Sequence, residues 1–171
     1  MSERSGIVTA GGNPVTLVGN EVKVGDRAPD FTAIGNDMTP VAFSSFGSKI
    51  RVITAVPSLD TDVCSTEVAR FNMEAGKLGD GVAIVTVSMD LPFAQARWCG
   101  AHGATNVTTV SDHRDAAFGS AYGVLIKETR LLARSVFVID GEGVVRYIQI
   151  VPELSHEPDY DEVLKAIEDV R

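Results

Sequence analysis

The sequence contains few residues of the kinds that bind metal ions or cross-link a small secreted fold. Only two cysteines, Cys64 and Cys99, occur among its 171 residues. They are too few and too far apart for a zinc knuckle or a disulfide-rich scaffold. The histidines, at positions 102, 113 and 156, lack the i,i+4 spacing of a helical metal site. We therefore expect no bound metal and no cofactor. We expect the two cysteines to have a role only if they react chemically.

Long apolar runs and an excess of positive charge are also missing. The formal net charge of −8, without a local cluster of Lys and Arg, opposes binding to phosphate backbones and anionic lipid. No apolar stretch approaches the roughly 20 residues needed to span a bilayer. Residues 1–12 lack the continuous apolar core of a secretion signal. We expect neither nucleic acid nor a membrane as partner, and a cytoplasmic location.

The length and composition are those of one globular domain. A chain of 171 residues, 44% hydrophobic and 22% charged, is long enough for a hydrophobic core and too short for two ordinary domains. We expect a single domain over residues 1–171. Near its start, two β-branched runs at 7–9 and 15–18 flank the turn sequence Gly-Gly-Asn-Pro, which predicts an N-terminal β-hairpin over about residues 6–19.

The rest of the chain alternates between strand and helix patterns. Apolar residues at 64, 68, 71, 75 and 78 align on one face of a helix that begins near Asp60, and Gly76, Gly79 and Gly81 are expected to end it. A β-α-β half followed by a β-β-α half predicts an α/β protein with a thioredoxin-like fold, in which helices flank a mixed central sheet. The expected strands are 49–56, 82–88, 107–111, 135–139 and 144–150, and the other expected helices are 92–99, 115–122 and 160–167.

The segment from Pro57 to Cys64 lies where a buried strand is followed by a helix, at the carboxyl end of that strand. With Asp60 or Thr61 as N-cap, Cys64 falls in or next to the first helical turn. Free N–H groups and the helix dipole there favour a thiolate over a thiol. Thr61 can place its hydroxyl beside the sulfur, and Pro57 can shield the sulfur from water. Arg134, just before a strand, is a candidate donor to the sulfur and to an oxygen of the substrate.

The spacing Pro57-x-x-x-Thr61-x-x-Cys64 matches the active-site motif of the peroxiredoxins. The chain resembles the bacterial thiol peroxidase branch of atypical two-cysteine peroxiredoxins over nearly its whole length, including residues 25–31, 57–71, 90–99 and 157–160. The resemblance implies a peroxidase that reduces hydrogen peroxide or small organic hydroperoxides. It implies that Cys64 is the peroxidatic cysteine, Cys99 the resolving cysteine, and Thr61 and Arg134 active-site residues.

The same resemblance implies thioredoxin as the reductant and a homodimer as the assembly, although no residue by itself identifies either. Attack on a hydroperoxide leaves Cys64 as a sulfenic acid, with which Cys99 can condense to an intramolecular disulfide. Because Cys64 and Cys99 fall on separate predicted helices, we expect the first turns of both helices to loosen when they join.

Each of these residues also has an ordinary structural interpretation. A buried cysteine is commonly an inert small hydrophobe, and Cys99 could be a plain apolar helix position. Thr61 could serve only as an N-cap, and Arg134 could be a surface arginine. Two rival functions remain open: a thiol–disulfide oxidoreductase, which ordinarily uses a Cys-x-x-Cys pair absent here, and a redox sensor that switches partners through the same disulfide without rapid turnover.

Overall fold

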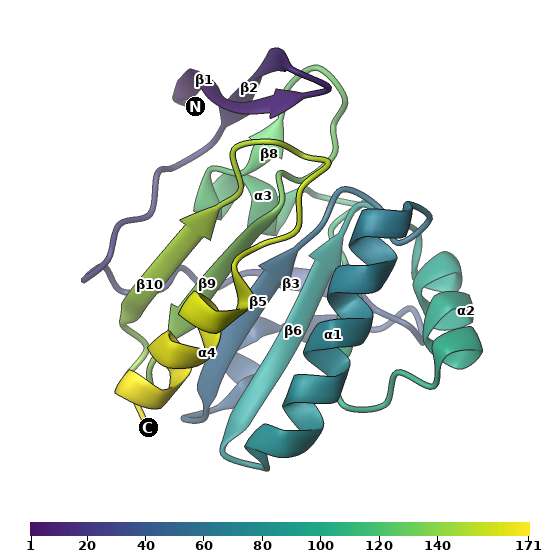
Figure 1. Cartoon of the computed structure of the whole chain (residues 1–171), viewed down its shortest axis with the longest axis vertical. Coiled ribbons are helices and arrows are strands. Elements are labelled where there is room, and N and C mark those ends of the chain that lie inside the picture. Colours follow the sequence, from purple (N-terminus) through teal and green to yellow (C-terminus); the bar gives the residue numbers. More distant parts are fainter.

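A computed structural model describes residues 1–171, and its centre is one seven-stranded mixed sheet (Figure 1). The strand order is β10-β9-β5-β6-β7-β3-β4. Strands β5, β6 and β7 run parallel, and the pairs on either side of them are antiparallel. The strands are β3 (Thr32–Gly35), β4 (Pro40–Ala42), β5 (Ile50–Ala55), β6 (Val82–Ser88), β7 (Thr108–Ser111), β9 (Ser135–Ile139) and β10 (Val145–Ile150).

The two faces of this sheet bury two separate apolar clusters, because side chains alternate between the faces along each strand. Val52, Ile84 and Val138 pack against α1 (Asp62–Leu78) and α4 (Tyr160–Asp169), with Trp98 of α2 (Pro92–His102) completing the cluster. Ile53 and Val85 face the other way, toward α3 (Ala117–Tyr122) and the N-terminal strands. Strands β5 and β6 are thus buried on both faces, which is why their sequences are nearly continuously apolar.

A small three-stranded sheet carries the N-terminus. Strand β1 (Glu3–Ala10) pairs with β2 (Asn13–Val18), and β2 pairs with the short β8 (Leu125–Ile126). Gly11 and Gly12 both have positive φ angles at the β1–β2 turn, a conformation that glycine adopts without steric cost. The tip of this hairpin leans over the carboxyl end of the central sheet, next to the loop that follows β10 (Figure 1).

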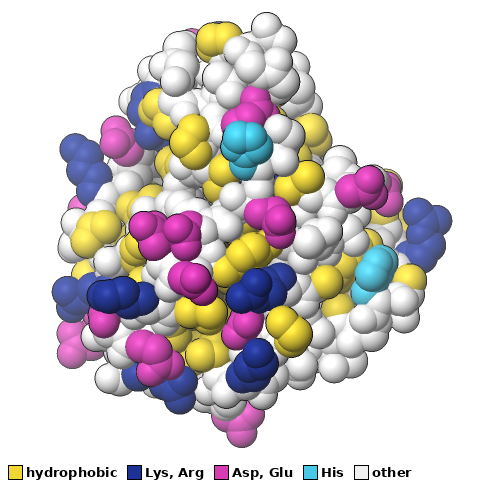
Figure 2. Space-filling view, viewed as in Figure 1, with side chains coloured by type: hydrophobic (Ala, Val, Ile, Leu, Met, Phe, Trp, Pro, Cys, Tyr) yellow, Lys and Arg dark blue, Asp and Glu magenta, His cyan; other side chains and the backbone are white.

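The charged groups on the face formed by α1 and α4 alternate in sign. Figure 2 shows acidic and basic side chains interspersed over this face, with no large cluster of one sign. Two of the basic groups belong to helical ion pairs, Arg70 with Glu74 and Lys165 with Asp169. None of the helices is both long enough and apolar enough to cross a bilayer.

The predicted thioredoxin-like fold and its N-terminal hairpin are confirmed, and so is every expected strand and helix to within a few residues. Three details of the prediction were wrong. Strands β3 and β4, between the hairpin and residue 49, were not among the expected strands. Gly76 lies inside α1, which ends only before Gly79. Helix α2 continues to His102, three residues beyond the expected end at Cys99.

Candidate active site

The backbone places Cys64 at the start of a helix, directly above the end of a central strand. Strand β5 ends at Ala55, the loop turns through Pro57, and Thr61 is the N-cap of α1, which makes Cys64 the third residue of the helix. The Thr61 hydroxyl does not cap the helix. It donates a hydrogen bond of 2.9 Å to the carbonyl oxygen of Ser58, which leaves its lone pairs free. The side chain of Cys64 is completely buried.

Arg134 supplies a guanidinium to the buried sulfur. It lies immediately before β9, and only 1% of its surface is exposed. Its Nη2 donates to the Sγ of Cys64 at 3.3 Å, and its Nη1 donates to Oε2 of Glu67 at 2.6 Å. Nε and Nη2 also donate to the backbone oxygen of Leu154, at 3.2 and 2.7 Å. These four bonds fix the plane of the guanidinium, and a charged donor in a buried site stabilises negative charge on the sulfur.

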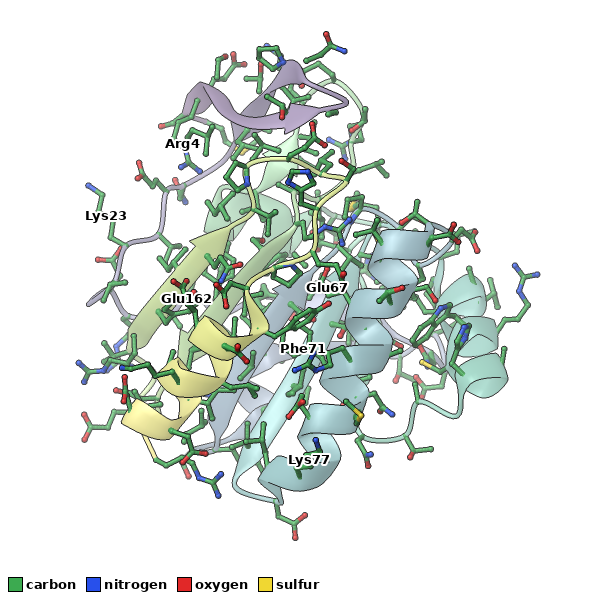
Figure 3. The ribbon with its side chains drawn as sticks, in the orientation of Figure 1. Arg4, Lys23, Glu67, Phe71, Lys77 and Glu162 are labelled. Carbon is green, nitrogen blue, oxygen red and sulfur yellow. The ribbon has the colours of Figure 1, made fainter.

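Glu67 shares the buried site, one helical turn after Cys64. Figure 3 shows Glu67 and Phe71 on the side of α1 that faces α4 and the sheet. Burial raises the pKa of Glu67 to about 7, although the charge of Arg134 works in the opposite direction. Its second oxygen, Oε1, has no hydrogen-bond partner. Burial of Arg134 lowers its pKa, but the nearby charges of Glu67 and Cys64 outweigh this and the net shift is upward.

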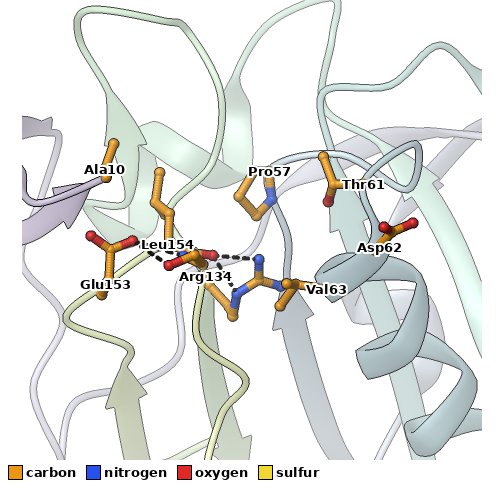
Figure 4. A pocket seen from close by; sticks show the side chains of 10 residues that line it. Ala10, Pro57, Thr61, Asp62, Val63, Arg134, Glu153 and Leu154 are labelled. Atoms are coloured by element: carbon orange, nitrogen blue, oxygen red, sulfur yellow. Dashed lines mark hydrogen bonds between the residues drawn. The ribbon is translucent and has the colours of Figure 1, made fainter.

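A cavity of about 300 Å³ opens onto this arrangement (Figure 4). Cys64 does not line it, but the guanidinium of Arg134 does, together with Pro57 and Thr61. Three segments that are distant in sequence form its wall. They are the hairpin turn with Ala10 and Gly11, the active-site loop and first turn of α1 with Pro57, Thr61, Asp62 and Val63, and the segment Glu153–Ser155 after β10.

Glu153 fastens two of these segments together. Its Oε1 accepts hydrogen bonds from the Thr9 hydroxyl at 2.9 Å and from the Gly12 N–H at 2.8 Å, while Oε2 accepts from the N–H and hydroxyl of Ser155. Hydrogen bonds from Ser155 and Gly12 lower the pKa of Glu153 to about 2. The backbone adds a bond from the Leu154 N–H to the Thr9 oxygen at 2.9 Å. The hairpin is thereby bonded to the same segment whose Leu154 carbonyl holds Arg134.

The second cysteine lies outside this arrangement. Cys99 is partly buried in the last turn of α2, and its Sγ lies 3.5 Å from the Thr109 hydroxyl of β7. Both cysteines are free thiols. Asp60 and Asp62, which could have opposed a thiolate if they pointed inward, are exposed. The structure therefore brings together Pro57, Thr61, Cys64 and Arg134, and leaves Cys99 on a neighbouring helix.

Sequence reasoning missed two components of the site. Glu67 is a carboxylate beside the apolar stripe of α1, and its signal was available, because position i+3 from Cys64 lies on the same helix face. The other component is the backbone oxygen of Leu154, which cannot be recognised from the type of residue at that position.

Comparison with known proteins places this arrangement in a family. The Redoxin family model matches residues 23–164. The chain is 53% identical to a thiol peroxidase of Halalkalibacterium halodurans and 54% identical to one of Bacillus subtilis, in each case over 93% of this chain and 95% of the relative. A peroxiredoxin-like protein from Aquifex aeolicus superposes with a TM-score of 0.91 at 46% identity, over 98% of both chains. The chain therefore belongs to the Redoxin family, within the thiol peroxidase branch of the peroxiredoxins.

Proposed function

We propose that this chain is a thiol-dependent peroxidase in which the thiolate of Cys64 attacks the terminal oxygen of a hydroperoxide. A new S–O bond forms as the O–O bond breaks, so that the sulfur is oxidised to a sulfenic acid and the departing oxygen leaves as water or an alcohol after taking up a proton. The observation that carries this proposal is the 3.3 Å hydrogen bond from a buried guanidinium to the sulfur, at the first turn of a helix beside an open cavity.

In this proposal Arg134 has two tasks. It stabilises the thiolate, and it stabilises the charge that develops on the peroxide oxygens in the transition state. Glu67 and the Leu154 oxygen act through Arg134, because their hydrogen bonds hold its guanidinium in the orientation that faces the sulfur. Thr61 accepts a hydrogen bond from the incoming peroxide, since its own proton is given to Ser58. Pro57 limits the access of water to the sulfur.

We further propose that Cys99 is the resolving cysteine. Its thiol attacks the Cys64 sulfenic acid, the S–S bond forms, and the sulfenic oxygen leaves as water. The sulfur of Cys64 contacts Arg134, whereas that of Cys99 contacts Thr109 of β7, so in this proposal the segments around both cysteines move before the S–S bond forms. Thioredoxin is the proposed reductant of this disulfide, and the cytoplasm the proposed compartment.

A homodimer is the proposed assembly. Phe93 and Leu91, at the start of α2, are 66% and 52% exposed, which is unusual for large apolar side chains. They line the same surface hollow as Met89 and as Asp60, which belongs to the loop before α1. We propose a second copy of the chain as the partner of this surface.

The test is a stopped-flow assay with purified protein, hydrogen peroxide or a small alkyl hydroperoxide, and thioredoxin. Wild type should turn over and form one intramolecular crosslink between Cys64 and Cys99, detected by mass spectrometry. Cys64→Ser should abolish turnover, whereas Cys99→Ser should still reduce one equivalent of peroxide. Slow, non-catalytic oxidation of the wild type, or Cys64 adducts between molecules alone, would contradict the proposal.

A further inference from the structure

Two hydrogen-bonded contacts join the segments that carry the two cysteines. The first joins the helices: the indole Nε1–H of Trp98 donates to the hydroxyl oxygen of Ser65 at 2.9 Å. Ser65 follows Cys64 directly, and Trp98 directly precedes Cys99. The second joins the loops before the helices: the carboxylate of Asp90 accepts hydrogen bonds from the Ser58 hydroxyl at 2.7 Å and from the Leu59 N–H at 2.8 Å.

The contact between the helices is well buried on the side of Trp98. The indole is 7% exposed and belongs to the same apolar cluster as Cys64. The imidazole of His102 stacks on it with ring centroids 4.3 Å apart, and the same imidazole lies 3.5 Å from the Ser65 oxygen and 2.9 Å from the Trp98 carbonyl oxygen. The hydroxyl of Ser65 is thus the polar group of α1 that Trp98 and His102, near the end of α2, both contact.

We infer that Ser65 and Trp98 form a positioning pair that holds Cys99 away from Cys64, and that release of their hydrogen bond helps to set the rate of disulfide formation. This inference rests on the proposed function. In that step the thiol of Cys99 loses its proton and forms an S–S bond with Cys64, and the sulfenic oxygen departs as water. Neither member of the pair lines the active-site cavity or contacts Arg134. The first step, the attack on peroxide, does not use the pair.

Loss of the Ser65 hydroxyl should therefore favour the form in which the end of α2 has separated from α1. A neutral hydrogen bond contributes enough to shift an equilibrium roughly two- to tenfold, and a buried indole N–H left without an acceptor adds to the shift in the same direction. Faster resolution shortens the lifetime of the sulfenic acid. Because a second peroxide competes for that sulfenic acid, the fraction of Cys64 oxidised to sulfinic acid at high peroxide should fall.

The test uses full-length Ser65→Ala, in which the only tryptophan, Trp98, reports the movement of α2 by fluorescence. Stopped-flow mixing with hydrogen peroxide separates a phase whose rate depends on peroxide concentration from a later phase that does not. We expect the later phase to be roughly two- to tenfold faster than in wild type, and the peroxide-dependent phase to be unchanged. Thr66→Ala, at the next and exposed position of α1, is the matched control and should alter neither phase.

Ser65→Thr restores a hydroxyl and should return the later phase toward the wild-type rate, which a general loosening of α1 would not allow. Trp98→Phe, followed by acid quench and mass spectrometry, tests the other member of the pair and should also speed disulfide formation. An unchanged or slower later phase in Ser65→Ala, or an equal acceleration in Thr66→Ala, would overturn the inference. A wild type without any peroxide-dependent phase would instead refute the proposed function.

Discussion

Replacement of Arg134 by methionine separates the two tasks proposed for its guanidinium. An ordinary thiol with a pKa of about 8.5 is only about 3% ionised at pH 7, so loss of thiolate slows the peroxide reaction by about 30-fold for a thiol of this ordinary kind. Loss of a charge-assisted hydrogen bond to the reacting atoms costs about 1.5–3 kcal/mol, or roughly a further 10- to 150-fold. At pH 9.5 an ordinary thiol is mostly ionised without help, so the first effect becomes smaller, whereas the second effect remains.

We therefore expect Arg134→Met to be slowed by several hundredfold or more at pH 7, and still by roughly 10- to 150-fold at pH 9.5. The assay is the second-order rate constant with hydrogen peroxide, measured on Cys99→Ser background so that only the first step is seen. Arg130→Met is the matched control, because Arg130 is exposed and its side chain makes no hydrogen bond. Circular dichroism is the check that each variant is folded. Full recovery of the wild-type rate at pH 9.5 would refute a role for Arg134 in the transition state.

Two further substitutions test neighbouring groups. Since burial raises the pKa of Glu67 from 4.5 to about 7, the folded protein retains a proton there that the unfolded chain loses, and the free energy of unfolding should fall by about 3 kcal/mol as the pH rises from 4.5 to 7. Glu67→Gln should lack this slope in urea unfolding at a series of pH values, and identical slopes in both proteins would contradict a raised pKa. Thr61→Val should slow the peroxide reaction roughly two- to tenfold while Thr61→Ser preserves it, and equal rates in all three proteins would remove the hydroxyl from the mechanism.

The sequence allows the side chains of the site to be predicted in part, but not the backbone groups. The pattern around Cys64 placed the cysteine correctly at a strand-to-helix junction, and Arg134 was singled out because it precedes a strand. Glu67 was overlooked, although its i+3 spacing places it on the same helix face as Cys64, because a glutamate in a helix is ordinarily solvated and its partner lies 67 residues away. The Leu154 carbonyl could not be predicted, since every residue has one.

The fold was also predictable only in part, and the long elements were predicted better than the short ones. Periodic apolar runs predicted the long elements, but β3 and β4 have only four and three residues, too short for an alternation to be recognised. They are strands because they pair with β7 and with each other at the sheet edge. The extent of α2 was underestimated because Gly100 lies within its last turn, where a glycine suggests an end.

The attachment of the N-terminal hairpin through Glu153 has a practical consequence. Thr9 and Gly12 are hydrogen-bonded to Glu153, and the carbonyl oxygen of the next residue, Leu154, accepts a hydrogen bond from the guanidinium of Arg134 that contacts Cys64. A chain that begins at residue 23, where the Redoxin match starts, would lose the hydrogen bonds from Thr9 and Gly12 to Glu153 while keeping every side chain that surrounds Cys64. Kinetic constants compared between preparations should come from proteins with identical amino termini.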